Sequence, residues 1–145
     1  MSKSPNRLVA VIVGGFYVAL GLVGFTATAG VGIVSTTGGF LFDVFGVNVL
    51  QNIVHVVIGA VLLAAGFAGV RVARGVNSAV GALFLAVGLA GLFLVGTDSN
   101  ILALNGADNV LHFGSSIVLL AVGLGADKPT AATAPAGKKS SGSAR

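Results

Sequence analysis

Long stretches without any charged side chain restrict the fold of this chain more than any other feature. Three of them run from Leu8 to Phe42, from Val44 to Val70 and from Gly75 to Thr97, and a fourth begins at Asn109. A helix that crosses a hydrocarbon core of about 30 Å needs roughly 20 apolar residues. With 55% hydrophobic residues and a mean hydropathy of +1.02, the chain lies far from soluble domains. We therefore predict an all-α integral membrane protein.

Polar residues divide these stretches into four predicted transmembrane helices. The first stretch is too long for one helix, and its second half is rich in Thr, Ser and Gly, which is typical of a turn region. Asn48 and Asn105 are suited to begin helices as N-caps. The predicted transmembrane domain covers residues 8–126, with helices at about 8–27, 48–70, 76–96 and 106–125.

The positions of the positive charges predict the orientation in the membrane. All eight Lys and Arg residues fall on one side of the predicted helices: Lys3, Arg7, Arg71, Arg74, Lys128, Lys138, Lys139 and Arg145. The two loops on the other side contain Asp43, Asp98 and Asp108 and neither Lys nor Arg. Because Lys and Arg are enriched in cytoplasmic segments, we expect residues 1–7 and 127–145 in the cytoplasm. The second segment has no apolar period and should be a disordered tail.

The sequence repeats itself as two helix pairs. A shift of 57 positions aligns residues 46–66 with 103–123 and matches three polar pairs: Asn48 with Asn105, Asn52 with Asn109, and His55 with His112. A shift of 67 aligns three glycines of the first helix with three of the third: Gly14, Gly21 and Gly24 with Gly81, Gly88 and Gly91. Each unit crosses the membrane twice, so both copies enter from the same side, as in parallel repeats about an axis along the membrane normal. We predict two helical hairpins with both termini inside.

A layer of polar side chains is expected near the outer face, where the second and fourth helices begin. Its predicted members are Asn48, Asn52, His55, Asn105, Asp108, Asn109 and His112. Asn48 and Asn105 can cap helices, with Gln51 and Asp108 at the reciprocal capping-box positions. Polar groups within a membrane are costly unless they are satisfied. We therefore expect Asn52, His55, Asn109 and His112 to form hydrogen bonds across the pseudo-twofold axis.

These residues leave several functions open. His55 and His112, with Asp108 as an oxygen ligand, could bind a metal, or the two histidines could ligate a haem. Two histidines underfill a zinc site, so we predict no metal or cofactor. Asp108 beside His112 is also compatible with a pH-sensitive element. A transporter or channel subunit would require an oligomer, because no charge ring or broken helix is evident.

Neither enzymatic nor nucleic-acid-binding function is favoured. The four carboxylates are all Asp, and no base and nucleophile share a recognisable motif. The positive charges flank membrane segments, whereas nucleic-acid-binding proteins gather them in a basic patch. We predict a non-enzymatic structural or partner-binding bundle in the lipid bilayer, which binds a second copy or another membrane protein.

Short motifs relate the chain to a known family. They are Phe45-Gly46-Val47-Asn48, then Asn52-Ile53-Val54-His55 with Gly59, and Asn105-Gly106-Ala107-Asp108-Asn109-Val110-Leu111-His112. With these motifs, residues 8–125 resemble the small, mostly actinobacterial membrane proteins of domain-of-unknown-function family four-three-eight-three. Gln51 stands where that family favours histidine, which argues against a role that needs three imidazoles. The resemblance implies a four-helix protein of the bacterial plasma membrane and implies no activity.

Overall fold

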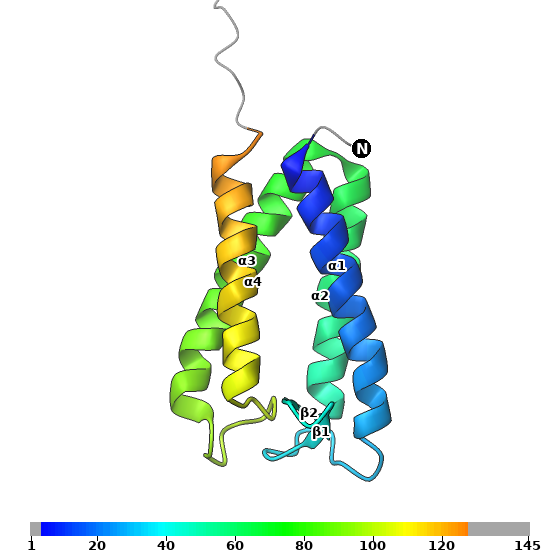
Figure 1. Ribbon diagram of the computed structural model, residues 1–145, viewed down its shortest axis with the longest axis vertical. Coiled ribbons are helices and arrows are strands. Elements are labelled where there is room, and N and C mark those ends of the chain that lie inside the picture. The colour runs from blue at the N-terminus through cyan, green and yellow to red at the C-terminus, as the bar shows by residue number, and fades with distance from the viewer. Residues whose placement is uncertain (1–3, 128–145) are drawn as a thin grey trace, which may run out of the picture.

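Four long helices dominate the computed structural model, which describes residues 4–127 (Figure 1). They are α1 (Pro5–Gly24), α2 (Val49–Ala68), α3 (Val70–Leu94) and α4 (Gly106–Gly125), and the 3₁₀ helix η1 (Phe25–Ala27) extends α1. All four are long and apolar enough to cross a membrane. The predicted class, a multi-pass membrane protein with four transmembrane helices, is confirmed.

Three of the helices begin at side-chain caps. The Ser4 hydroxyl accepts a hydrogen bond from the Arg7 amide, and Pro5 occupies the first helical position, where its missing N–H costs nothing. The Asn48 side chain accepts from the amide of Gln51 at 2.8 Å. Asn105 and Asp108 form a complete capping box at the start of α4. The two asparagine caps stand where the sequence predicts them.

The connection between α2 and α3 is shorter than predicted. Gly69 alone separates the two helices, with φ 142° and ψ 173°, a conformation that is essentially restricted to glycine. We expected α2 to reach residue 70 and the third helix to begin near residue 76, but α3 begins at Val70. Arg71 and Arg74 therefore belong to the first turns of α3. Their long side chains can reach polar surroundings from within a helix, so they do not require a loop.

Close glycine contacts hold each hairpin together. A Cβ added to Gly14 of α1 would lie 2.8 Å from the Gly59 oxygen and 2.7 Å from the Leu63 nitrogen of α2. A Cβ added to Gly81 of α3 would lie 3.0 Å from the Leu120 nitrogen of α4. Leu63 and Leu120 are equivalent under the shift of 57, so the two hairpins use matching contacts. Small residues at such positions allow membrane helices to approach closely.

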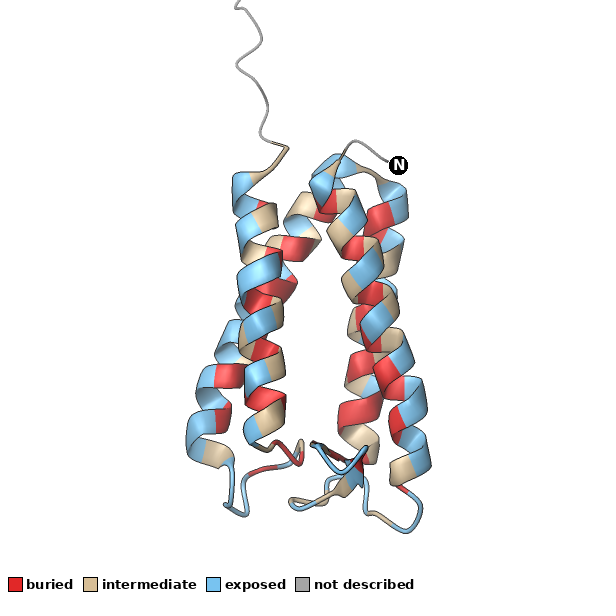
Figure 2. Cartoon of the chain, viewed as in Figure 1, coloured by how far each residue is buried: buried red, intermediate tan, exposed pale blue. Residues whose placement is uncertain are grey.

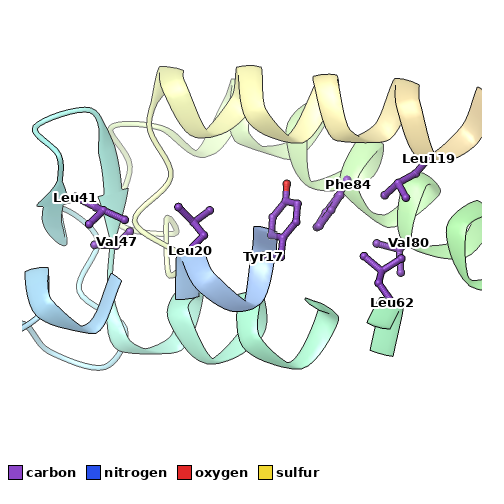
Figure 3. Close-up of a cluster of buried hydrophobic side chains, with 8 residues drawn as sticks. All are labelled: Tyr17, Leu20, Leu41, Val47, Leu62, Val80, Phe84 and Leu119. Atoms are coloured by element: carbon purple, nitrogen blue, oxygen red, sulfur yellow. The ribbon is translucent and has the colours of Figure 1, made fainter. Parts of the chain in front are cut away.

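The core lies between the two hairpins. Figure 1 shows the hairpins converging near the α2–α3 connection and separating toward the opposite end. Buried side chains from both hairpins fill this space (Figure 3): Tyr17, Leu20, Leu41, Val47, Leu62, Val80, Phe84 and Leu119. The outward faces of all four helices are largely exposed (Figure 2). Many large apolar side chains lie on these faces, as expected of surfaces that contact lipid.

A small β-hairpin covers the end where the hairpins separate, and the sequence did not predict it. Strands β1 (Gly39–Leu41) and β2 (Phe45–Val47) pair antiparallel. In the turn between them, Phe42 and Asp43 both have positive φ. Leu41 is buried and Phe40 is exposed, which is the alternation of a strand with one covered face. The region expected to be a polar turn therefore ends in an ordered cap on the bundle.

Candidate functional site

The predicted polar layer gathers at one end of the bundle, around the first turns of α2 and α4. Six of its seven members are buried: Asn48, Asn52, His55, Asp108, Asn109 and His112. Asn105 is partly buried at the start of α4. The structure thus brings all of the predicted residues to the end of the bundle that the β1–β2 hairpin covers.

The two cap asparagines connect each repeat to the other. The Asn48 amide donates to the carbonyl of Ile101 at 2.8 Å, and the Asn105 amide donates to the carbonyl of Val44 at 2.8 Å. Val44 and Ile101 are equivalent under the shift of 57, so the two bonds are reciprocal. Asp108 adds a third link, because its carboxylate accepts from the Gly46 amide at 3.2 Å. Together these bonds fasten the loops at this end of the two hairpins.

Gln51 lies between Asp108 and two backbone carbonyls. With its nitrogen toward the carbonyls, the Gln51 amide donates to Leu102 at 2.8 Å and to Gly46 at 2.7 Å. In the opposite orientation, its nitrogen lies 3.4 Å from an oxygen of Asp108. The first orientation is preferred, because it makes two short bonds in place of one long one.

Four rings meet deeper in the bundle, on the pseudo-twofold axis. The ring centroids of His55 and His112 are 6.1 Å apart, and those of Tyr17 and Phe84 are 4.7 Å apart in a stacked arrangement. Tyr17 also contacts His55, and Phe84 contacts His112, with centroids at 5.1 and 5.4 Å. Tyr17 and Phe84 are equivalent under the shift of 67. Our sequence reading missed this pair, although the alignment of Gly14 with Gly81 would have identified it.

The hydrogen bonds expected across the axis do not form, and that prediction was wrong. Within the described residues, both amide atoms of Asn52, Oδ1 of Asn109, and Nδ1 of both histidines lack a partner. The two asparagines instead pack against a glycine of their own hairpin, Asn52 against Gly24 and Asn109 against Gly91. Because glycine has no side chain, each amide fits between the two helices of its own hairpin and does not face the axis.

A cavity of about 200 Å³ borders the histidines. Gln51, His55 and His112 are the polar residues that line it, and its wall is almost entirely apolar. Within residues 4–127, no group of three His, Cys, Asp or Glu side chains could hold a metal ion. The candidate ligands His55, His112 and Asp108 therefore do not converge. The chemistry available at this site is hydrogen bonding by two imidazoles in apolar surroundings.

A second polar cluster, at the opposite end, was not predicted. The Asn77 amide of α3 donates to the backbone and side-chain oxygens of Asn6 at 3.0 and 3.1 Å. Asn6 in turn donates to the carboxylate of Asp127 at 3.0 Å, and Ser4 donates to the same carboxylate at 2.7 Å. The Ser4 hydroxyl holds the pKa of Asp127 below its usual value. This cluster joins α1, α3 and the end of α4.

Asp127 consequently belongs to the folded part of the chain. The sequence analysis assigned it to a disordered tail of residues 127–145. Its bonds to Ser4 and Asn6 connect it to the start of α1. The remainder of that predicted tail, residues 128–145, lies outside the described residues.

Comparison with known protein families now places the chain. The family described as "Domain of unknown function (DUF4383)" matches residues 7–125. The chain belongs to this family. The matched segment spans α2, α3, α4 and all of α1 except Pro5 and Asn6, and it contains the whole polar layer. Searches among curated proteins and among solved structures find no match.

Proposed function

We propose that this protein is a non-enzymatic, partner-binding bundle of the bacterial plasma membrane. The observation that carries the proposal is the reciprocal pair of bonds from Asn48 to Ile101 and from Asn105 to Val44. These bonds use the polar side chains of the outer end to hold the two hairpins in a fixed arrangement. A scaffold requires this kind of rigidity, and its lipid-facing helix surfaces remain free to bind another membrane protein.

The environment of the only carboxylate in the polar layer supports a role without catalysis. Asp108 accepts hydrogen bonds from the amides of Gly46 and Asn105. A carboxylate held by backbone amides on two segments is suited to fastening them. The core cluster that fills the space between the hairpins likewise favours a packed scaffold over a pore through one copy.

The distribution of charge supports cytoplasmic termini. Arg7 lies in the first turn of α1, and Arg71 and Arg74 lie in the first turns of α3, at the end where the described chain begins (Figure 1). Asp43 and Asp98 lie in the connections at the other end. The positive-inside rule places the arginine end in the cytoplasm. Alkaline phosphatase fused after residue 145 should be inactive, and the same enzyme inserted after Thr97 should be active. The reverse pattern would contradict this orientation.

The exposed face of α4 is the surface we propose for the partner. Val110 and Ile117 are 73% and 69% exposed, and a Cβ added to Gly114 between them would meet nothing within 4 Å. These three residues lie on one face of the helix. A glycine flanked by large apolar residues lets a second membrane helix approach closely, and this property favours a second copy of the chain as the partner.

Native mass spectrometry of gently extracted protein tests this function. We expect a clean multiple of the 14.2 kDa chain mass. Gly114→Leu should convert this species to the monomer without unfolding it, because the site is open in the single chain. Gly114→Ala, a smaller change at the same site, is the matched control and should retain more of the oligomer. A monomeric wild-type protein without any bound partner would refute the proposal.

A further inference from the structure

The cavity beside the histidines lies on one side of the bundle, between α2 and α3. Its wall includes Gln51, His55 and Ile58 of α2, Leu83 and Phe84 of α3, and His112 of α4. Leu83 is 47% exposed on the outward surface of α3. Since this surface faces lipid in a membrane-spanning helix, the edge of the cavity adjoins the bilayer. A ligand could enter from the membrane at this point.

A difference between the two repeats explains why the cavity lies on this side. On the α1–α4 side, the Tyr17 hydroxyl lies 2.9 Å from the Ser115 hydroxyl, and the bond between them joins the hairpins. The equivalent residues on the α2–α3 side are Phe84, under the shift of 67, and Ile58, under the shift of 57. Phenylalanine and isoleucine cannot form that bond. The α2–α3 side therefore lacks a hydrogen bond equivalent to the one that joins α1 to α4.

The wall of the cavity defines the chemistry of its ligand. Among residues 4–127, no charged side chain borders it, so a neutral molecule is favoured. The two imidazoles can donate or accept hydrogen bonds, whereas the Gln51 amide nitrogen is already bonded to the carbonyls of Leu102 and Gly46. The edge of the wall that Phe84 forms is apolar and aromatic. A flat ring with polar oxygen atoms would satisfy the imidazoles and this apolar wall.

The volume and the position of the cavity limit the ligand further. About 200 Å³ is below the roughly 300–1,000 Å³ of pockets that hold drug-sized molecules. A porphyrin is too large for this space, which disfavours a haem between His55 and His112. A single ring fits, provided that any longer chain attached to it leaves past Leu83 into the lipid.

We propose that this cavity binds the ring of a membrane quinone. An imidazole N–H of His55 or His112 donates to a quinone carbonyl oxygen, the ring packs against Phe84, and the isoprenoid chain extends past Leu83 into the bilayer. The proposal concerns binding alone and includes no electron transfer. It is independent of the partner surface on α4, because Val110, Gly114 and Ile117 do not border the cavity.

A tryptophan reporter can test the proposal, because the chain contains no Trp. Leu83→Trp places the indole at the edge of the cavity. Leu89→Trp is the matched control, since Leu89 is 49% exposed on the same helix and does not border the cavity. The probe is 2,3-dimethoxy-5-methyl-1,4-benzoquinone, a one-ring quinone without a tail, titrated into each variant in lipid nanodiscs.

We expect saturable quenching of the Leu83→Trp fluorescence at one quinone per chain, and only a linear, unsaturated decrease for Leu89→Trp. Adding His55→Phe and His112→Phe to the reporter should weaken the saturable binding at least about tenfold, the effect of losing one hydrogen bond to a ligand. Equal melting temperatures would show that these variants still fold. If the histidine changes unfold the bundle, Ile58→Phe, which reduces the cavity without touching a polar group, should remove the saturable phase.

A second measurement identifies the natural ligand. Organic extracts of the wild-type protein, purified from its own membranes, should contain a quinone that is depleted in the double histidine variant. Linear quenching in both tryptophan variants would overturn the proposal. Recovery of a phospholipid or an isoprenoid alcohol, with no quinone, would overturn it as well.

Discussion

Replacing Gly59 by alanine tests whether the close approach of α1 and α2 determines the geometry of the first hairpin. A Cβ at this position would lie 2.6 Å from both the Gly14 oxygen and the Val18 nitrogen. Both are backbone atoms of α1, so no side-chain rotation can relieve the collision. Real Cβ contacts essentially never fall below 3.0 Å, so the two helices must move apart by several tenths of an ångström.

The expected cost follows from this displacement. Adding one carbon to a closely packed site typically costs about 1–3 kcal/mol. For a domain of this size, each kcal/mol lowers the melting temperature by roughly 2–4 °C. Gly59→Ala should therefore lower the melting temperature by about 2–12 °C.

Gly15→Ala is the matched control, because a Cβ at Gly15 would meet nothing within 4 Å. Both variants can carry a fluorescent protein at the C-terminus, be heated in detergent, and be analysed by size-exclusion chromatography. The fraction that still elutes as folded protein gives the melting midpoint. Equal midpoints for the Gly59 and Gly15 variants would refute the reasoning, because they would show that the helices tolerate a side chain at their closest contact.

Three further predictions concern the polar residues. Gly24→Ala should destabilise the protein, because its Cβ would collide with the Asn52 amide. Adding Asn52→Ala removes that amide and should restore stability. Additive effects of the two changes in a double-mutant cycle would contradict this prediction. Asn77→Ala should lower the free energy of unfolding by about 0.6–1.7 kcal/mol, the range for hydrogen bonds between membrane helices, measured by unfolding in mixed micelles. Asp127→Asn should destabilise the protein at neutral pH but not in acid. The pKa of Asp127 is lowered in the folded state, so its contribution is fully present above the ordinary carboxyl pKa of 3.8 and is lost as the pH falls through the lower folded value. A difference in melting temperature that persists in acid would contradict this prediction.

The helices and their duplication were predictable because they depend on local sequence. Apolar runs of sufficient length determine the number of membrane crossings, and the repeat is visible in the sequence itself. The caps at Asn48 and Asn105 were equally accessible, since a capping bond involves residues three positions apart. The α2–α3 connection was predicted wrongly, because a charged residue does not have to end a membrane helix. Arg71 and Arg74 lie within the first turns of α3.

The partners of the polar residues were less predictable, because they depend on other helices. The position of the Asn52 amide depends on Gly24 of α1, and no pattern within α2 reveals that contact. The cluster of Asn6, Asn77 and Asp127 joins residues 71 and 121 positions apart. Self-comparison could not find it either, because Ala10 occupies the position equivalent to Asn77.

The one-residue connection at Gly69 also bears on how the two halves can diverge. Two separate hairpins that assembled symmetrically would share one sequence, so any change on one side of the axis would appear on the other. Fusion into one polypeptide removes this constraint. Tyr17 and Ser115 can then close one flank while Phe84 and Ile58 leave the other open. Gene duplication followed by fusion would thus allow a symmetric pair of hairpins to have a cavity on one side only. Such a protein would bind one ligand for every two hairpins.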